Sequence, residues 1–241
     1  NHFATAALLI VTLLCLLFFI VLTILSIKIE WLSFINLPIH LFMQSFHTTL
    51  LEAFFIVCTQ LTSTITIFSL YIICCLWFLY HKNEKPIIYL TSLIISSSIL
   101  AFFLAYFINS PRPTGIQVIM PGSSFPATNL QIATAFYGFI LLYINNKYSL
   151  LTNTLRSVIL VILGLSGFGT IYLGDVWFTD VLAAYFFGAA LCLIHYMIYR
   201  KTNLNYLKTI QSASILFTLF AGIVFSMGLS TYFNFKTLAY N

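Results

Sequence analysis

The chain turns back on itself at the stretch Gly169-Thr170-Ile171-Tyr172-Leu173-Gly174-Asp175-Val176-Trp177-Phe178-Thr179-Asp180. Apolar runs flank this stretch at residues 154–173 and 179–199. Each run has about the 20 residues that a helix needs to cross the hydrocarbon core of a bilayer. The stretch between them therefore predicts a turn at one face of a membrane, and this turn carries two carboxyl groups, Asp175 and Asp180.

Two other polar segments are predicted at the same face. Pro111-Arg112-Pro113 follows the apolar run at 86–108, and Phe125-Pro126-Ala127-Thr128-Asn129 precedes the run at 130–146. The loop that joins them, residues 109–129, is long for a compact domain, and such loops are usually functional or disordered. Its prolines and glycines favour a shaped loop. The sequence thus predicts three polar segments at one end of a helical bundle.

The composition is that of an integral membrane protein. Of the 241 residues, 61% are hydrophobic and only 6% are charged, whereas about a quarter of the residues of a soluble domain are charged. The net charge of +5 comes from basic residues in short loops rather than in one patch, so nucleic acid is not an expected partner. We expect a single all-α domain in the membrane, over residues 1–241.

Seven membrane spans are predicted from the apolar runs. They cover residues about 5–27, 58–80, 86–108, 130–146, 154–173, 179–199 and 209–232. Residues 32–57 are also apolar, but they are interrupted by polar residues and a proline, Asn36, Pro38, His40 and His47. This mixture favours an interfacial amphipathic segment over another crossing.

The basic residues orient these spans, because cytoplasmic loops carry an excess of lysine and arginine. One side holds seven of them: Lys82, Lys85, Lys147, Arg156, Arg200, Lys201 and Lys208. The other side holds three: Lys28, Arg112 and Lys236. The imbalance predicts a cytoplasmic N-terminus and places the three polar segments on the outer face, which is periplasmic if the membrane is a bacterial inner membrane.

The order and framing of the three segments resemble the signature of the PAP2 family of membrane lipid phosphatases. That family carries a Lys-x6-Arg-Pro motif, a Pro-Ser-Gly-His motif and a Ser-Arg-x5-His-x3-Asp motif. The resemblance covers about residues 55–200. It implies a polytopic membrane bundle with the family's six-helix core, to which the span at about 209–232 would be an extra C-terminal helix.

Most of the family's reactive positions hold other residues in this chain. In the first motif Arg112-Pro113 matches, but Ala105 stands at the lysine position. In the second, Pro126 is retained and is followed by Ala127-Thr128-Asn129 in place of Ser-Gly-His. Asn129 can donate a hydrogen bond but cannot relay a proton. Arg112 keeps a planar guanidinium that suits a phosphate.

The third motif differs most. Gly169 stands for the serine, Thr170 for the arginine and Val176 for the histidine that the family uses as nucleophile. Valine has no lone pair, so a phosphohistidine cannot form there. Asp180, which in the family orients that histidine, is retained, and Asp175 is a new carboxyl group beside the replaced position.

The sequence therefore predicts a binding site without a catalytic residue. Its substrate-binding candidates are Arg112, Thr128, Asn129, Thr170, Asp175 and Asp180. Simpler roles stay open: Arg112 as a general anchor to headgroups, and Thr128 and Asn129 as caps of the next helix. Two carboxyl groups without a third ligand do not predict a metal site, and no cofactor is expected. The cysteines lie in apolar runs and lack metal-ligand spacing.

Three functions are compatible with these residues. The first is an inactive PAP2-like protein that binds lipid phosphates or acts as a structural subunit, beside a membrane-protein partner or a fused domain. The second is an active phosphatidate or isoprenoid phosphatase with a rebuilt site, in which Asp175 or an outer-side histidine takes a new role, since carboxylates accept phosphoryl groups elsewhere. The third is a lipid transporter or flippase, although the sequence offers neither an inverted repeat nor many buried charges.

Overall fold

The computed structural model describes residues 2–113, 123–144, 150–202, 218 and 221–228. These residues form helices and no strands. In chain order the helices are α1 (His2–Ile27), α2 (Ile29–Ser45), α3 (Thr49–Gln60), α4 (Thr64–Tyr80), α5 (Lys85–Ile108), α6 (Thr128–Tyr143), α7 (Leu150–Tyr172) and α8 (Phe178–Thr202). The prediction of an all-α membrane bundle is confirmed.

Local signals in the sequence account for several helix boundaries. Thr48 caps α3 by accepting a hydrogen bond from the Leu51 N–H, and Ser63 caps α4 by accepting one from the Thr66 N–H. Pro86 occupies the first turn of α5, where its missing N–H costs nothing. At its other end, α5 stops at Asn109, which has a left-handed backbone conformation with φ of 40°. Asparagine tolerates that conformation better than most residues.

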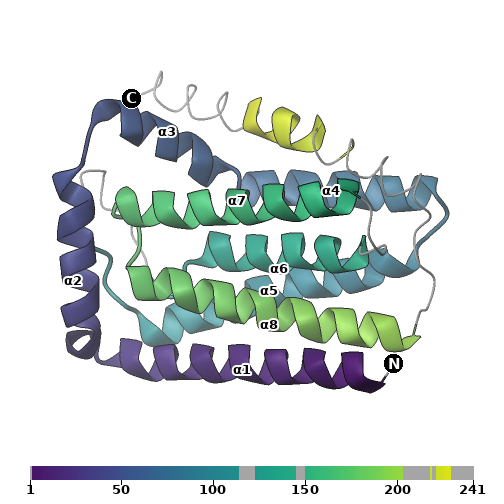
Figure 1. Ribbon diagram of the computed structural model, residues 1–241, viewed down its shortest axis with the longest axis horizontal. Coiled ribbons are helices and arrows are strands. Elements are labelled where there is room, and N and C mark those ends of the chain that lie inside the picture. The colour runs from purple at the N-terminus through teal and green to yellow at the C-terminus, as the bar shows by residue number, and fades with distance from the viewer. Residues whose placement is uncertain (1, 114–122, 145–149, 203–217, 219–220, 229–241) are drawn as a thin grey trace.

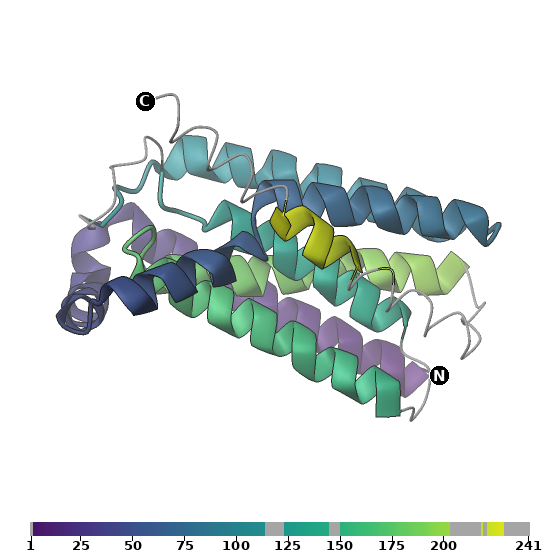
Figure 2. The ribbon, with the colours of Figure 1, turned by 90° about the horizontal axis from the view of Figure 1, so that it is seen from above.

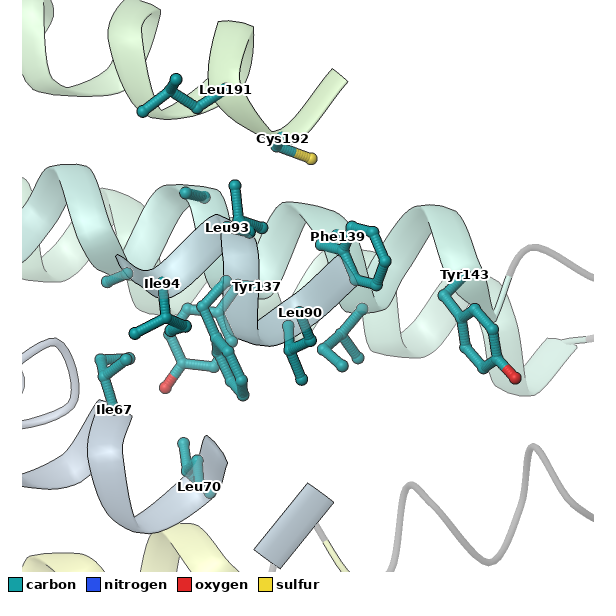
Figure 3. Packing of buried hydrophobic residues seen from close by; sticks show 14 of the residues in the cluster. Ile67, Leu70, Leu90, Leu93, Ile94, Tyr137, Phe139, Tyr143, Leu191 and Cys192 are labelled. Atoms are coloured by element: carbon teal, nitrogen blue, oxygen red, sulfur yellow. The ribbon is translucent and has the colours of Figure 1, made fainter. Parts of the chain in front are cut away.

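Helix α6 lies at the centre of the bundle, between α5 and α8 (Figure 1). Ten of its 16 residues are buried, including Gln131, Phe136 and Phe139. Figure 3 shows side chains of α4, α5, α6 and α8 packed together in this core. One close helix contact requires glycine: a Cβ at Gly188 would come 2.6 Å from the Gln131 carbonyl oxygen.

The outer surface of the bundle is apolar. Large side chains such as Leu13, Phe102 and Phe107 are more than half exposed. In water such an apolar surface would drive aggregation, whereas a bilayer solvates it. Five described helical segments are long and apolar enough to cross a membrane: Thr5–Ile27, Thr49–Tyr80, Lys85–Ile108, Asn153–Tyr172 and Phe178–Thr202.

These segments differ from the predicted spans in three places. Helix α6 forms where residues 130–146 were predicted to span, but it has only 16 residues and is enclosed by other helices. The span predicted at 58–80 is interrupted, because α3 ends at Gln60 and α4 begins at Thr64. The extra span predicted at 209–232 lies mostly outside the described residues. Of it the structure shows a helical segment at 221–228, which contacts α4.

Helix α2 runs across one end of the bundle, roughly perpendicular to α1, α7 and α8 (Figures 1 and 2). Its outer side exposes Phe34, Leu37 and Phe42, whereas Asn36 and His40 are buried against the bundle. The segment predicted as interfacial, residues 32–57, thus consists of most of α2 and most of α3. The ends of α5 and α7 and the starts of α6 and α8 all point toward α2.

The contact between α6 and α8 provides a test of this packing. Replacing Gly188→Ala should lower the free energy of unfolding by about 1–3 kcal/mol, because the added methyl group would overlap a main-chain oxygen that cannot rotate away. Gly164→Ala is the matched control, since a Cβ at Gly164 meets nothing within 4 Å. Thermal unfolding in detergent measures both variants. Equal melting temperatures for the two would contradict the packing of α6 on α8.

Candidate functional site

The three polar segments of the sequence meet in one cavity near the end of the bundle that α2 crosses. The cavity has a volume of about 270 Å³. Its walls come from the break between α3 and α4, the chain before α6, and the loop between α7 and α8. The lining residues are Thr59, Gln60, Thr62, Ser63, Arg112, Ser123, Ser124, Pro126, Ala127, Thr128, Asn129, Leu130, Thr170, Asp175 and Val176.

Arg112 joins two of these walls. Its Nη1 donates a hydrogen bond of 3.1 Å to the main-chain oxygen of Asp175, and its Nη2 lies 3.5 Å from the main-chain oxygen of Ser123. Its Nε is buried without a hydrogen-bond partner. Next to it, Trp177 Nε1 donates a 2.8 Å bond to the carbonyl oxygen of Pro111. The guanidinium is therefore held by main-chain oxygens and has donor capacity left over.

Two serines shape the loop that carries Arg112. Ser124 N donates to the Ser110 carbonyl oxygen at 2.9 Å, and the two hydroxyl groups lie 3.1 Å apart. Ser123 Oγ accepts from the Ser110 N–H and donates to the carbonyl oxygen of Phe125. These bonds fasten the end of α5 to the chain that enters α6. These hydrogen bonds thus hold the backbone near Arg112 in place.

Helix α6 begins at the cavity without a side-chain cap. Its N-cap position is Ala127, which has no side-chain hydrogen bond to offer. Thr128 Oγ1 donates to the Pro126 carbonyl oxygen, and Asn129 Oδ1 accepts from Thr64 Oγ1 at 2.8 Å. The capping role considered for Thr128 and Asn129 is therefore wrong. The first N–H groups of a helix have no acceptor within it, and together with the helix dipole they favour an anion.

The loop between α7 and α8 contributes the third wall. Gly174 adopts φ of 73°, which lets the chain reverse, and Asp175 N donates to the Thr170 carbonyl oxygen at 3.0 Å. Val176 lines the cavity but is only 7% exposed, because it packs in an apolar cluster with Leu130 and Ile171. An isopropyl group thus occupies the place where the resemblance implies a nucleophile.

Helix α2 holds the start of α8 in place. Asn36 Oδ1 accepts a 3.2 Å hydrogen bond from the Thr179 N–H, and Asn36 Nδ2 donates a 2.8 Å bond to Thr179 Oγ1. The side chains of Asn36 and Thr179 are both buried. The His40 ring contacts the edge of the Trp177 ring, with centroids 5.6 Å apart. A side chain 143 residues away therefore caps α8 and supports the loop that carries Asp175.

The two carboxyl groups have different surroundings. Asp175 is half-buried at the cavity wall, and among the described residues no donor bonds to its carboxylate. Burial raises the pKa of the Asp175 carboxyl above its usual range, and the nearby Arg112 guanidinium lowers it to a smaller extent. Asp180 is only 1% exposed and lies beside Ser124 and Thr179. Its Oδ2 has no partner.

Five of the six predicted site residues thus line the cavity: Arg112, Thr128, Asn129, Thr170 and Asp175. Asp180 lies behind the wall rather than in it. The prediction missed the contribution of the α3–α4 break, because residues 58–80 were interpreted as one span. The polar run Thr59-Gln60-Leu61-Thr62-Ser63-Thr64 was the signal for that break. From the sequence, Asn36 is predicted only to be a polar interruption of an apolar segment.

The described side chains offer no cluster of metal ligands. Within the described ranges, no three His, Cys, Asp or Glu side chains come close enough to hold a metal ion. The cavity instead offers hydrogen-bond donors: a guanidinium, hydroxyl groups and the start of a helix. Chemically, this arrangement can bind a small anionic group.

Comparisons with known proteins agree on one fold. The sequence profile of the PAP2 superfamily matches residues 85–204. The crystal structure of a transmembrane PAP2-type phosphatidylglycerolphosphate phosphatase from Bacillus subtilis is similar, with a TM-score of 0.72 and 21% identity over 80% of this chain and 98% of that chain. The structure of Aquifex aeolicus LpxE has a TM-score of 0.50 and 24% identity over 69% and 94% of the two chains. No curated protein matched the sequence.

The carboxyl group of Asp175 should make stability depend on pH. Because burial raises its pKa in the folded protein, the folded state binds more protons than the unfolded state as pH rises from the ordinary carboxyl pKa to the raised one, and stability falls over that window. Asp175→Asn should therefore raise the melting temperature at pH 7, and the gain should vanish below the ordinary carboxyl pKa. Thermal unfolding of both proteins across pH 3 to 8 tests this, and a gain independent of pH would refute it.

The cap supplied by α2 can be removed directly. Asn36→Leu should lower the free energy of unfolding by about 2 kcal/mol, because two hydrogen bonds are lost and the Thr179 N–H is left buried without a partner. Ser33→Ala, at an exposed position of the same helix, should stay within about 0.5 kcal/mol of the parent. Chemical or thermal unfolding in detergent compares the three proteins. An unchanged free energy of unfolding in Asn36→Leu would show that α2 does not support the α7–α8 loop.

Proposed function

Because the chain belongs to the PAP2 superfamily, as the match over residues 85–204 shows, we propose that it binds phosphorylated lipid headgroups without hydrolysing them. The site is the cavity that contains Arg112, Asp175 and the start of α6. The observation that carries this proposal is that the Arg112 guanidinium and the uncapped start of α6 line the same cavity. Both groups favour an anion.

The replacement of the serine and the histidines of the family's motifs supports binding without hydrolysis. Cleavage of a phosphomonoester through a covalent intermediate needs a nucleophile and a proton donor for the leaving group. The motif positions that would supply them hold Ala127, Asn129 and Val176. Among the described lining residues there is no histidine or cysteine.

Three hydroxyl groups of the cavity donate their protons to main-chain oxygens. Ser123 Oγ donates to the Phe125 carbonyl oxygen, Thr128 Oγ1 to that of Pro126, and Thr170 Oγ1 to that of Gly167. A hydroxyl proton committed to a main-chain oxygen is not being removed by a base. These groups can still accept or exchange hydrogen bonds with a bound headgroup, so they suit recognition better than attack.

The setting in a membrane points to lipids as the ligands. Apolar side chains cover the outer surface of the bundle, and the cavity opens near one end of it. The similar Bacillus subtilis protein is, by its name, a phosphatase of a phosphorylated lipid. By analogy we assign the same class of headgroup to this chain, as a binding or structural subunit beside a membrane-protein partner or a fused domain.

The orientation follows the charge imbalance. Lys82 and Lys85 lie at the turn between α4 and α5, and Arg200 and Lys201 lie in the last turn of α8. These helix ends are opposite α2, whereas Arg112 follows the end of α5 that points toward α2 (Figure 1). Basic residues favour the cytoplasmic side. We therefore place the N-terminus in the cytoplasm and the cavity at the outer, periplasmic face of a bacterial inner membrane.

The proposal predicts Arg112-dependent binding without turnover. Purified protein in detergent should release no phosphate above background from phosphatidate or from isoprenoid phosphates and pyrophosphates. It should nevertheless bind phospholipid in native mass spectrometry titrations. Arg112→Gln should weaken that binding by about 10- to 100-fold, because a hydrogen bond to a charged group contributes about 1.5–3 kcal/mol.

Lys28→Gln is the matched control for charge. Lys28 lies at the same end of the molecule but outside the cavity, with its Nζ over the Trp31 ring, so its removal should leave affinity unchanged. Phosphate release by the parent protein that is lost in Arg112→Gln would contradict the proposal and show that the protein is an enzyme with a rebuilt site. Equal affinities of Arg112→Gln and the parent would refute the cavity as the binding site.

A further inference from the structure

The cavity carries charges of both signs. Arg112 is the cationic side chain among its described lining residues, and Asp175 is the carboxylate among them. Asp180 adds a second carboxyl group just behind the wall. A site built for a phosphate alone would be expected to hold an excess of positive charge. The two charged lining side chains, Arg112 and Asp175, instead give no net formal charge, which suits a phosphomonoester dianion poorly.

The two charged side chains at the wall are not paired with each other. Arg112 Nη1 donates to the main-chain oxygen of Asp175 rather than to its carboxylate. Among the described residues the carboxylate has no hydrogen-bond donor, although it is half-buried. The cavity thus presents a guanidinium and a carboxylate that are not paired with each other.

A ligand that satisfies both groups must itself carry both charges. We infer that the cavity recognises a zwitterionic phospholipid headgroup, with its phosphodiester at Arg112 and the start of α6 and its primary ammonium at the Asp175 carboxylate. This inference rests on the proposed function and names the class of lipid. A phosphodiester brings one negative charge instead of two, and the ammonium offsets the charge of Asp175.

A neighbouring apolar groove favours a whole lipid, rather than a soluble headgroup, as the ligand. The groove, about 500 Å³ in volume, lies between α2, α7 and α8. It is lined by Pro38, Ile39, Phe42, Met43, Phe168, Ile171 and Phe178. One apolar cluster lies between the groove and the cavity: Val176 and Leu130 of the cavity wall pack with Ile171, and Phe178, Ile39 and Met43 pack against them. We assign an acyl chain of the same lipid to this groove.

The test compares lipids that differ in one group. The full chain in detergent is titrated with phosphatidylethanolamine, phosphatidylglycerol and phosphatidate, and affinities are read by native mass spectrometry. Phosphatidylethanolamine should bind at least about tenfold more tightly than phosphatidylglycerol, which has the phosphodiester but no amine, because a partly desolvated charge pair can contribute 1.5 kcal/mol or more. Phosphatidate should bind more weakly still.

Single-residue variants test whether Asp175 causes the preference for phosphatidylethanolamine. Asp175→Asn should abolish the preference for the amine while retaining binding of phosphatidylglycerol. Glu30→Gln is the matched control, since Glu30 is an exposed carboxylate at the same end of the molecule and outside the cavity. The Glu30→Gln variant should prefer phosphatidylethanolamine over phosphatidylglycerol to the same extent as the parent protein. Arg112→Gln should weaken all three lipids together.

The outcomes separate this inference from the proposed function. If phosphatidate binds most tightly and Asp175→Asn leaves the ratios unchanged, the zwitterion is excluded while an Arg112-dependent lipid-phosphate site stands. If Arg112→Gln changes no affinity, the proposed function itself fails. If soluble glycerophosphoethanolamine binds as tightly as the lipid, the ligand is a free headgroup and the assignment to a lipid is overturned.

Discussion

The close packing of α6 against α8 is the constraint on which the rest of the structure depends. Gly188 lets the backbone of α8 approach the main chain of α6 at a distance that a single added carbon would prevent. Because the start of α6 and the loop that enters α8 both line the cavity, this contact holds two of the cavity walls in position relative to each other.

Main-chain hydrogen bonds, rather than ion pairs, hold the cavity walls together. Arg112 and Trp177 tie the loop after α5 to the loop before α8 through carbonyl oxygens. This arrangement leaves the Asp175 carboxylate and part of the guanidinium available to a ligand. A structural ion pair would have consumed both charges. These two groups are the ones on which the proposed recognition of a headgroup depends.

Helix α2 links the membrane surface to the cavity. Its exposed face is apolar, while Asn36 and His40 reach inward to Thr179 and Trp177. The same helix forms one side of the apolar groove. A lipid that enters beside α2 would thus contact the element that caps α8 and supports Asp175. This coupling gives a physical reason for an amphipathic helix at this place rather than another span.

The sequence by itself determined the membrane class, the helical fold and the three polar segments, because hydropathy, helix-breaking residues and motif order are local properties. It also identified Arg112, Thr128, Asn129, Thr170 and Asp175, which the structure brings to one cavity. Only the tertiary structure decided that α6 is a short enclosed helix, that residues 58–80 break at the cavity, and that Asn36 caps α8. Those features depend on contacts between residues far apart in the chain, where burial and hydrogen-bond geometry outweigh local pattern. The unpaired state of Arg112 and Asp175 was likewise invisible in the sequence, since it depends on which oxygen the guanidinium reaches.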